Sequence, residues 1–258
     1  MTPQIEARGL NLSYGDRAIQ RNLNFTVQAG ERFIIMGDSG CGKSTLLKHL
    51  IALYQPAAGQ ICFQGTDLWQ MSAEQRQTLL QRCGVLYQSG ALFSSMTLAQ
   101  NVALPISQYT KLRAIDVAQL VDLKLSLVGL AGFGDYYPSQ ISGGMKKRAG
   151  LARAMALDPE ILLLDEPSAG LDPLSSRLLD ELILELNESL GTTFLIVSHE
   201  LASIFAIGSN SIFLDSESKT QLAQGDPKVL AASCPVDKVR RFLNRGDLPQ
   251  LAPAITNQ

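Results

Sequence analysis

Residues 37–44 read GDSGCGKS, and this stretch constrains the fold of the chain more than any other. It fits the pattern GxxxxGK[ST], in which glycines let backbone N–H groups curl around a polyphosphate and a helix N-terminus adds positive potential. The apolar run 33–36 precedes it, as expected of a buried parallel strand, and a helix is expected from Lys43 to about Leu53. This strand-loop-helix context predicts a phosphate-binding loop rather than a glycine-rich turn without a ligand.

The loop is predicted to bind ATP with every residue from 37 to 45. These residues are Gly37, Asp38, Ser39, Gly40, Cys41, Gly42, Lys43, Ser44 and Thr45. Lys43 is expected to bridge the terminal phosphates, and the Ser44 hydroxyl is expected to ligate Mg²⁺. ATP and Mg²⁺ are therefore the predicted cofactors.

Two later apolar runs, 161–164 and 193–197, end in polar residues. Because ligands in open parallel sheets sit beyond the carboxyl ends of the strands, these ends and the phosphate loop predict one site. Asp165 is expected to hold Mg²⁺ through water, and Glu166 to activate the attacking water. His199 is expected to sense the γ-phosphate. The alternatives are a capping pair of carboxylates and a structural histidine, and the position beside the phosphate loop disfavours both.

A second Gly-Gly loop follows at 141–148, ISGGMKKR. Ser142 is a good helix N-cap, and Ser142, Gly143 and Gly144 together predict a second anion-binding loop. The cations at 146–148 crowd the first turn, where the helix dipole is already positive. For each of these three cations taken singly, a solvated basic face is the favoured interpretation.

The rest of the chain predicts a core with two additions. Alternating polar and apolar residues between 5 and 27 indicate antiparallel strands, and residues from about 88 to 157 indicate a helical subdomain inserted between core strands. The first predicted domain is 1–225. A C-terminal helical extension and loosely ordered tail is predicted for 226–258.

Composition excludes several classes of protein. The net charge of −2 over 258 residues predicts no nucleic-acid partner, and the four cysteines have no spacing typical of metal ligands. The apolar runs are shorter than the about 20 residues that a membrane-spanning helix needs. We therefore expect four reduced thiols and no membrane span.

In this order, the motifs resemble the ATP-binding subunit of ABC transporters. Tyr14 matches the aromatic residue that stacks on adenine in that family, Gln88 its Q-loop, 141–145 its LSGGQ signature, 161–166 its Walker B strand, Asp172 its D-loop and His199 its H-loop. The resemblance implies an α/β P-loop NTPase with a mostly parallel sheet, an antiparallel β subdomain and the inserted helical subdomain. It also implies that Gln88 binds the metal and takes part in catalysis, and that Tyr14 and Asp172 bind the nucleotide.

The same resemblance implies partners. A second copy of the chain would form a nucleotide-sandwich homodimer, in which Ser142, Gly143 and Gly144 contact the ATP held by the other copy. A multi-span permease would dock on the helical subdomain near Gln88 to Asn101. Such a dimer would explain why one chain carries two anion-binding loops. Each copy would supply one half of each of the two ATP sites.

A narrower resemblance, at 85–105 and 137–159, is to the ATPase subunits of MCE-type (Mla-like) lipid transporters. In that group SGGM replaces SGGQ, so Met145 departs from the general pattern and agrees with the subgroup. This implies phospholipid transport between the inner membrane and the periplasmic or outer-membrane side, a partner with an MCE domain, and a peripheral location on the cytoplasmic face of the inner membrane. The alternative is a soluble ABC ATPase that drives assembly, as in iron–sulfur cluster assembly. A nucleic-acid or ribosome ATPase is disfavoured by the near-neutral charge.

Overall fold

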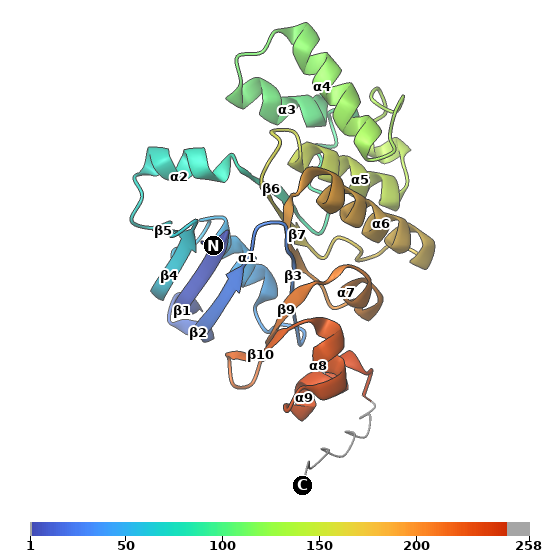
Figure 1. Ribbon diagram of the computed structural model, residues 1–258. Coiled ribbons are helices and arrows are strands. Elements are labelled where there is room, and N and C mark those ends of the chain that lie inside the picture. Colours follow the sequence, from blue (N-terminus) through green and yellow to red (C-terminus); the bar gives the residue numbers. More distant parts are fainter. Residues whose placement is uncertain (1, 247–258) are drawn as a thin grey trace.

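A computed structural model describes residues 2–246, and its centre is a six-stranded sheet in the order β10-β9-β3-β8-β7-β6 (Figure 1). The strands are β3 (Arg32–Gly37), β6 (Cys83–Leu86), β7 (Ile161–Asp165), β8 (Thr193–Val197), β9 (Asn210–Leu214) and β10 (Gln221–Gly225). All neighbouring pairs are parallel except β9 and β10. The three predicted apolar runs are β3, β7 and β8, and they are adjacent, so their carboxyl ends meet at one edge.

A smaller antiparallel sheet, in the order β2-β1-β4-β5, covers one face of the central sheet. Its strands are β1 (Ile5–Tyr14), β2 (Arg17–Val27), β4 (Ala58–Phe63) and β5 (Thr66–Asp67). The rings of Phe25 and Phe33 stack 5.5 Å apart and join the two sheets. The alternation between residues 5 and 27 predicts β1 and β2, because a sheet with one solvent-exposed face has alternating polar and apolar residues, and the resemblance to the family implies the subdomain as a whole.

Helices lie between and after the strands, and several of them pack on the two faces of the central sheet. They are α1 (Lys43–Leu50), α2 (Ala73–Leu80), α3 (Leu98–Tyr109), α4 (Ala114–Leu127), η1 (Pro138–Gln140), α5 (Gly143–Ala154), α6 (Pro173–Leu190), α7 (Leu201–Ile207), α8 (Pro227–Ser233) and α9 (Asp237–Leu243). Strand side chains alternate between faces, so Phe33 and Ile35 of β3 join a core with α1 and the β subdomain. Ile34 and Met36 join the other core, which includes α5, α6 and α7.

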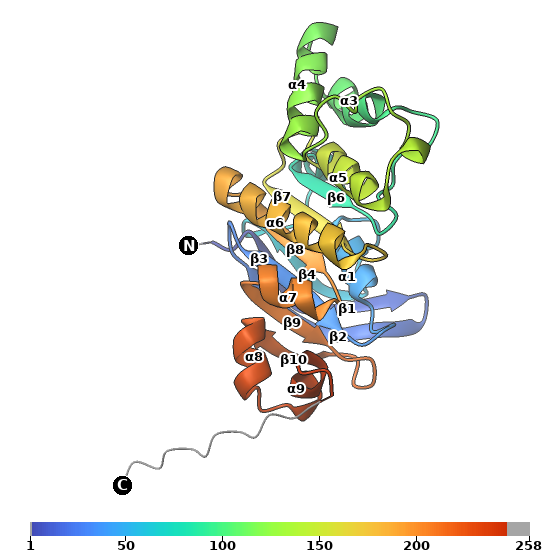
Figure 2. The ribbon, with the colours of Figure 1, turned by 90° about the vertical axis from the view of Figure 1, so that its right-hand side faces the viewer.

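The inserted segment between β6 and β7 contains α3, α4, η1 and α5, and α3 and α4 stand away from the sheet (Figures 1 and 2). Regular helix begins only at Leu98, so the expectation of helix from about 88 is too early. Residues 88–97 form a loop anchored by the buried Asn101. Its Oδ1 accepts from Phe93 N–H at 2.8 Å, and its Nδ2 donates to the carbonyls of Phe93 and Met96.

The C-terminal helices α8 and α9 lie beside β9 and β10 at the opposite end of the molecule (Figure 2). The predicted loosely ordered end of the chain falls on 247–258, outside the described residues. The division into 1–225 and 226–258 stays a prediction. Within residues 2–246, none of the helices combines the length and apolar character needed to cross a membrane.

A buried acid between α6 and α7 makes fold stability depend on pH. Asp180 is 7% exposed, and the Ser203 hydroxyl donates to its Oδ2 at 2.8 Å. Burial raises the pKa of Asp180 to about 6. In the unfolded chain this carboxyl ionises near pH 4, so the folded state loses stability as pH rises from about 4 to 6 and remains less stable above.

Asp180→Asn is therefore expected to stabilise the fold at pH 8 by about 2–3 kcal/mol, since an amide keeps the hydrogen bond without a buried charge. Thermal unfolding of wild type and variant at pH 8 and pH 4 checks this. The gain should vanish at pH 4, where the wild-type carboxyl is neutral in the folded state. An equal effect at both pH values would contradict the assignment.

Candidate active site

The loop at 37–44 sits where β3 turns into α1, and close packing dictates its glycines. A side chain at Gly37 would place its Cβ 2.1 Å from the carbonyl oxygen of Leu214, and one at Gly42 would meet Ile19 Cγ2 at 2.5 Å. Both glycines also have positive φ, 145° and 102°. Only glycine satisfies both conditions at these positions. The loop is thus wrapped tightly by β9 and β2.

Lys43, the first residue of α1, folds back over the loop. Its Nζ donates to the carbonyls of Gly37 at 2.9 Å and Asp38 at 3.0 Å, and the residue is 9% exposed. The Cys41 side chain instead points into the core, at 1% exposure, and burial raises the pKa of its thiol. Within the loop, Cys41 can therefore offer a ligand only its backbone.

A cavity of about 700 Å³ opens over the loop and collects most of the predicted residues. It is lined by Gly37, Asp38, Ser39, Gly40, Gly42, Lys43, Ser44, Thr45, Gln88, Glu166, His199 and Phe242. Apart from Phe242, every one of these was predicted to serve nucleotide, metal or catalysis. The volume lies within the about 300–1,000 Å³ typical of small-molecule sites.

Asp165 does not line this cavity, but it contacts Ser44, which does. The Ser44 hydroxyl donates to Asp165 Oδ1 at 2.9 Å, and Asp165 is 8% exposed at the end of β7. A hydroxyl and a carboxylate are hard oxygen donors of the kind Mg²⁺ prefers. The donor set present here therefore fits that ion.

Glu166 and His199 form a pair at the ends of β7 and β8. His199 Nδ1 lies 2.8 Å from Glu166 Oε1, in a hydrogen bond. Within the described residues, Oε2 of Glu166 is buried and has no hydrogen-bond partner. Glu166 also has φ of 49°, the left-handed region that is strained for a residue with a side chain. Backbone strain and an unpaired buried carboxylate oxygen are features that cluster at functional sites.

Lys147 of α5 is a residue that the sequence interpretation missed. It is 6% exposed, and its Nζ donates to the backbone carbonyls of Gln88 and Glu166, the latter at 3.2 Å. The expectation of a solvated basic face is therefore wrong for Lys147, because the loop after β6 lies directly on α5. Neighbouring Arg148 donates to the carbonyl of Val128 at 3.1 Å. Three consecutive cations look alike in sequence, and nothing in their spacing distinguishes the buried one.

The remaining predicted residues are not in this cavity. Ser142 caps α5 by accepting from Met145 N–H at 3.2 Å, and Asp172 caps α6. The two helix starts are close, since a Cβ at Gly144 would lie 3.3 Å from Ser175. Tyr14 is 43% exposed and packs edge-on against Tyr54 with ring centroids 5.2 Å apart, while Gly143 is exposed beside the α6 start. One chain thus carries two separate groups of predicted site residues.

The sequence profile of the ABC transporter family matches residues 20–169, more than half of the chain. The chain belongs to the ABC transporter family. The match begins within β2 and extends past Glu166, so it includes the phosphate loop, Gln88 and the Gly-Gly loop at 143–144. The resemblance noted from the motifs is confirmed.

Two curated relatives extend the similarity beyond this segment. This ABC ATPase is 41% identical over 244 residues to the probable ribonucleotide transport ATP-binding protein Mkl of Mycobacterium tuberculosis (strain H37Rv), covering 95% of this chain and 67% of that protein. It is 39% identical over 253 residues to the intermembrane phospholipid transport system ATP-binding protein MlaF of Escherichia coli K12, covering 97% and 93%. The resemblance of this chain to the Mla-like subgroup of the family is thus confirmed.

Among solved structures, this ABC ATPase is similar to the dimeric post-hydrolysis state of the ATP-binding cassette MJ0796 bound to ADP and Pi. The TM-score is 0.78 at 25% identity, covering 86% of this chain and 98% of that one. The predicted P-loop NTPase fold of the ABC type is confirmed. The protein is an ATP-binding, ATP-hydrolysing subunit of a transporter.

Proposed function

We propose that this ABC ATPase powers phospholipid transport between the inner membrane and the periplasmic or outer-membrane side, from the cytoplasmic face of the inner membrane. The observation that carries the proposal is the 39% identity to MlaF, which extends over 93% of that protein. The Mla-like SGGM stretch at 142–145 supports it. The name of Mkl refers to ribonucleotides, so the experiment has to distinguish the two cargoes.

The geometry supports in-line attack of water on the terminal phosphate of ATP. Lys43 would exchange its bonds to the carbonyls of Gly37 and Asp38 for phosphate oxygens, since charge-assisted bonds to phosphate are the stronger kind. Glu166 would accept the proton of the attacking water at Oε2, the oxygen left unpaired by its bond to His199. His199, 55% exposed at its side chain, fixes the direction of that carboxylate.

Mg²⁺ is the proposed metal, held by Ser44 and Gln88 and, through water, by Asp165. When bound, it would neutralise charge on the phosphates of ATP. The Ser44–Asp165 hydrogen bond keeps both oxygens on one side of the cavity. The burial of Asp165 limits its motion, so the protein contributes a fixed donor set.

Ser142, Gly143 and Gly144 are proposed to bind the ATP held by a second copy of the chain, with Asp172 and Tyr14 contributing to the same composite sites. None of the five lines the cavity over residues 37–45. The similar cassette MJ0796 is a dimer with ADP and Pi bound. A head-to-tail homodimer would bring the two groups of residues together, which explains two anion-binding loops in one chain.

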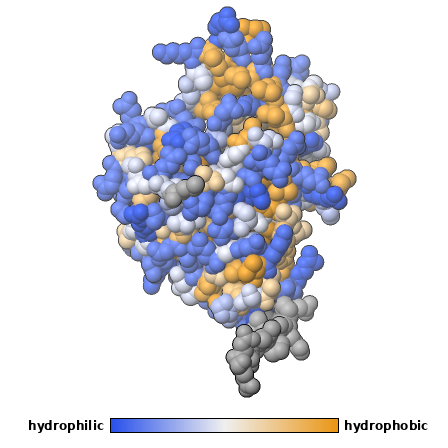
Figure 3. Space-filling view, viewed as in Figure 1, coloured by the Kyte–Doolittle hydropathy of each residue, from blue (hydrophilic) through white to orange (hydrophobic). Residues whose placement is uncertain are grey.

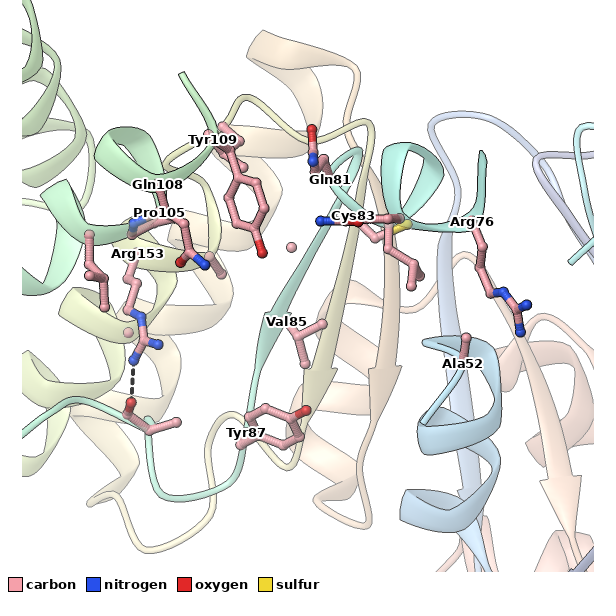
Figure 4. A pocket seen from close by; sticks show the side chains of 18 of the residues that line it. Ala52, Arg76, Gln81, Cys83, Val85, Tyr87, Pro105, Gln108, Tyr109 and Arg153 are labelled. Atoms are coloured by element: carbon pink, nitrogen blue, oxygen red, sulfur yellow. Dashed lines mark hydrogen bonds between the residues drawn. The ribbon is translucent and has the colours of Figure 1, made fainter. Parts of the chain in front are cut away.

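A permease is proposed to dock in a groove of about 630 Å³ between β6 and the helical subdomain. Figure 4 shows Val85 of β6 and Tyr87, just after that strand, on one side and Pro105, Tyr109 and Arg153 on the other. The Arg153 guanidinium donates to the carbonyl of Ala91, so the Q-loop backbone forms one wall. Movement of a docked helix would therefore reach the Q-loop directly.

The surface near this groove supports such docking. Figure 3 shows apolar surface gathered over the upper end of the molecule, where α3 and α4 lie in Figure 1. Leu112, Ile115 and Leu123 are 46%, 59% and 51% exposed in this segment. Exposed apolar clusters on a soluble domain commonly mark contact surfaces.

The experiment is an affinity purification of Glu166→Gln from detergent-solubilised native membranes with ATP, because a variant that binds without hydrolysing holds its complex. We expect a multi-span permease and an MCE-domain protein to co-purify, with phospholipid detected by mass spectrometry of the extracted complex. Lys43→Ala as bait is the matched control and should recover less of the complex. Soluble scaffold proteins without a permease would instead support an assembly ATPase, and enrichment of ribonucleotide beyond the supplied ATP would replace the phospholipid cargo.

A further inference from the structure

Helix α9, in the C-terminal extension, reaches the phosphate-binding loop although it lies outside the segment matched by the family profile. Phe242 lines the cavity together with residues 37–40 and 42–45. One turn earlier, Lys238 places its Nζ 2.9 Å from Asp38 Oδ2, within the loop itself. No feature of the sequence pattern connects these positions, which are 200 residues apart.

Lys238 forms ion pairs with more than one carboxylate. Its Nζ also lies 2.5 Å from Asp215 Oδ1, at the end of β9, and 3.1 Å from Glu217 Oε1. Asp215 is 3% exposed. Burial alone would raise the pKa of Asp215, but the contact with Lys238 and hydrogen bonds from Ser218 outweigh it and bring the pKa to about 2. Lys238 and the Ser218 donors thus keep this buried carboxylate charged beside the phosphate-binding loop.

The same cluster is bound to the backbone of the loop. Gln20 Nε2 donates to the carbonyl of Cys41 at 2.7 Å and to the carbonyl of Asp215 at 2.9 Å. The Ser216 hydroxyl donates to Asp38 Oδ2 at 3.2 Å. The segment that follows β9 therefore packs against the outside of the loop. Lys238 of α9 contacts both this segment and the loop.

We propose that α9 is part of the nucleotide site, with Lys238 as a positioning residue that holds Asp38 and offsets part of the carboxylate charge beside the bound phosphates. The inference rests on the proposed role of residues 37–45 in binding ATP. Without Lys238, the carboxylate cluster of Asp38, Asp215 and Glu217 would carry one more uncompensated negative charge near a polyanion. Repulsion between these charges and ATP would weaken binding, because like charges within a few ångströms disfavour each other.

The test is titration of a fluorescent ATP analogue into Lys238→Met, Lys238→Arg and wild type. The expected dissociation constant rises about 10-fold in Lys238→Met, the size expected for one partly screened charge near an anion. Lys238→Arg should stay close to wild type, since the charge is kept. Lys228→Met, on exposed α8, is the matched control and should change affinity less than 2-fold. The maximal hydrolysis rate at saturating ATP should change little, because Lys238 does not contact Glu166.

A charge-compensating variant separates this role from simple loss of structure. Adding Asp215→Asn to Lys238→Met removes the buried carboxylate that lost its partner and should recover most of the lost affinity. An unchanged dissociation constant in Lys238→Met overturns the proposal. Weakened binding that Asp215→Asn does not recover also overturns the proposal, because that result is expected if Lys238 only holds α9 in place. Lys43→Ala is measured in parallel, and retention of ATP by that variant would instead overturn the phosphate-binding role of the loop.

Discussion

Glu166→Gln is expected to bind ATP with wild-type affinity and to hydrolyse it about 10²–10⁴-fold more slowly. The amide keeps the shape of the side chain and can still accept a hydrogen bond from His199, but it cannot take a proton from water. In the wild type, His199 is hydrogen-bonded to Oε1 and Oε2 has no hydrogen-bond partner within the described residues, so we expect Oε2 to take the proton once bound ATP brings the attacking water to it. Release of inorganic phosphate at saturating ATP measures the effect.

The same variant should accumulate as a dimer with ATP, because the proposed nucleotide sandwich would close and not reopen. Light scattering after size-exclusion chromatography measures the mass with and without ATP. The matched control is Glu185→Gln, at an exposed position of α6, which should hydrolyse and elute like wild type. Wild-type turnover in Glu166→Gln would remove this residue as the base. A loss of ATP binding would show that the substitution damaged the phosphate-binding loop.

Lys43→Ala is expected to weaken ATP binding about 100-fold or more, since charge-assisted hydrogen bonds contribute about 1.5–3 kcal/mol each and Lys43 can reach more than one phosphate oxygen. The residue is also the only side chain that bonds the carbonyls of both Gly37 and Asp38 among residues 2–246. Removing it loosens the loop as well as removing the charge. Nucleotide titration by calorimetry or fluorescence gives the change in affinity.

The control for Lys43→Ala is Lys111→Ala, an exposed lysine in the connection between α3 and α4. It removes one charge far from the loop in sequence and should leave affinity unchanged. The melting temperature of both variants shows whether folding is affected. ATP binding of wild-type strength by a folded Lys43→Ala chain would mean that phosphate is held elsewhere.

The sequence alone was sufficient to predict three of the six central strands and most of the residues that line the cavity. β3, β7 and β8 were readable because buried parallel strands are continuously apolar, and their polar ends were expected to meet because such strands share one carboxyl edge. Glu166, His199 and every residue of 37–45 except Cys41 line one cavity, and their individual roles remain predictions. The antiparallel strands β1 and β2 were equally predictable from the sequence. Polar and apolar residues alternate in such strands because one face of the sheet is exposed to solvent.

Only the tertiary structure decided which of several similar side chains is buried and what lies next to it. Lys147 and Lys146 are neighbours in sequence, yet Lys147 holds the carbonyls of Gln88 and Glu166. Lys238 reaches Asp38 across 200 residues of chain. Sequence periodicity reports how a residue faces its own helix or strand, whereas these contacts depend on which other element covers that face. That choice is made by packing between distant segments, and it leaves no local pattern in the sequence.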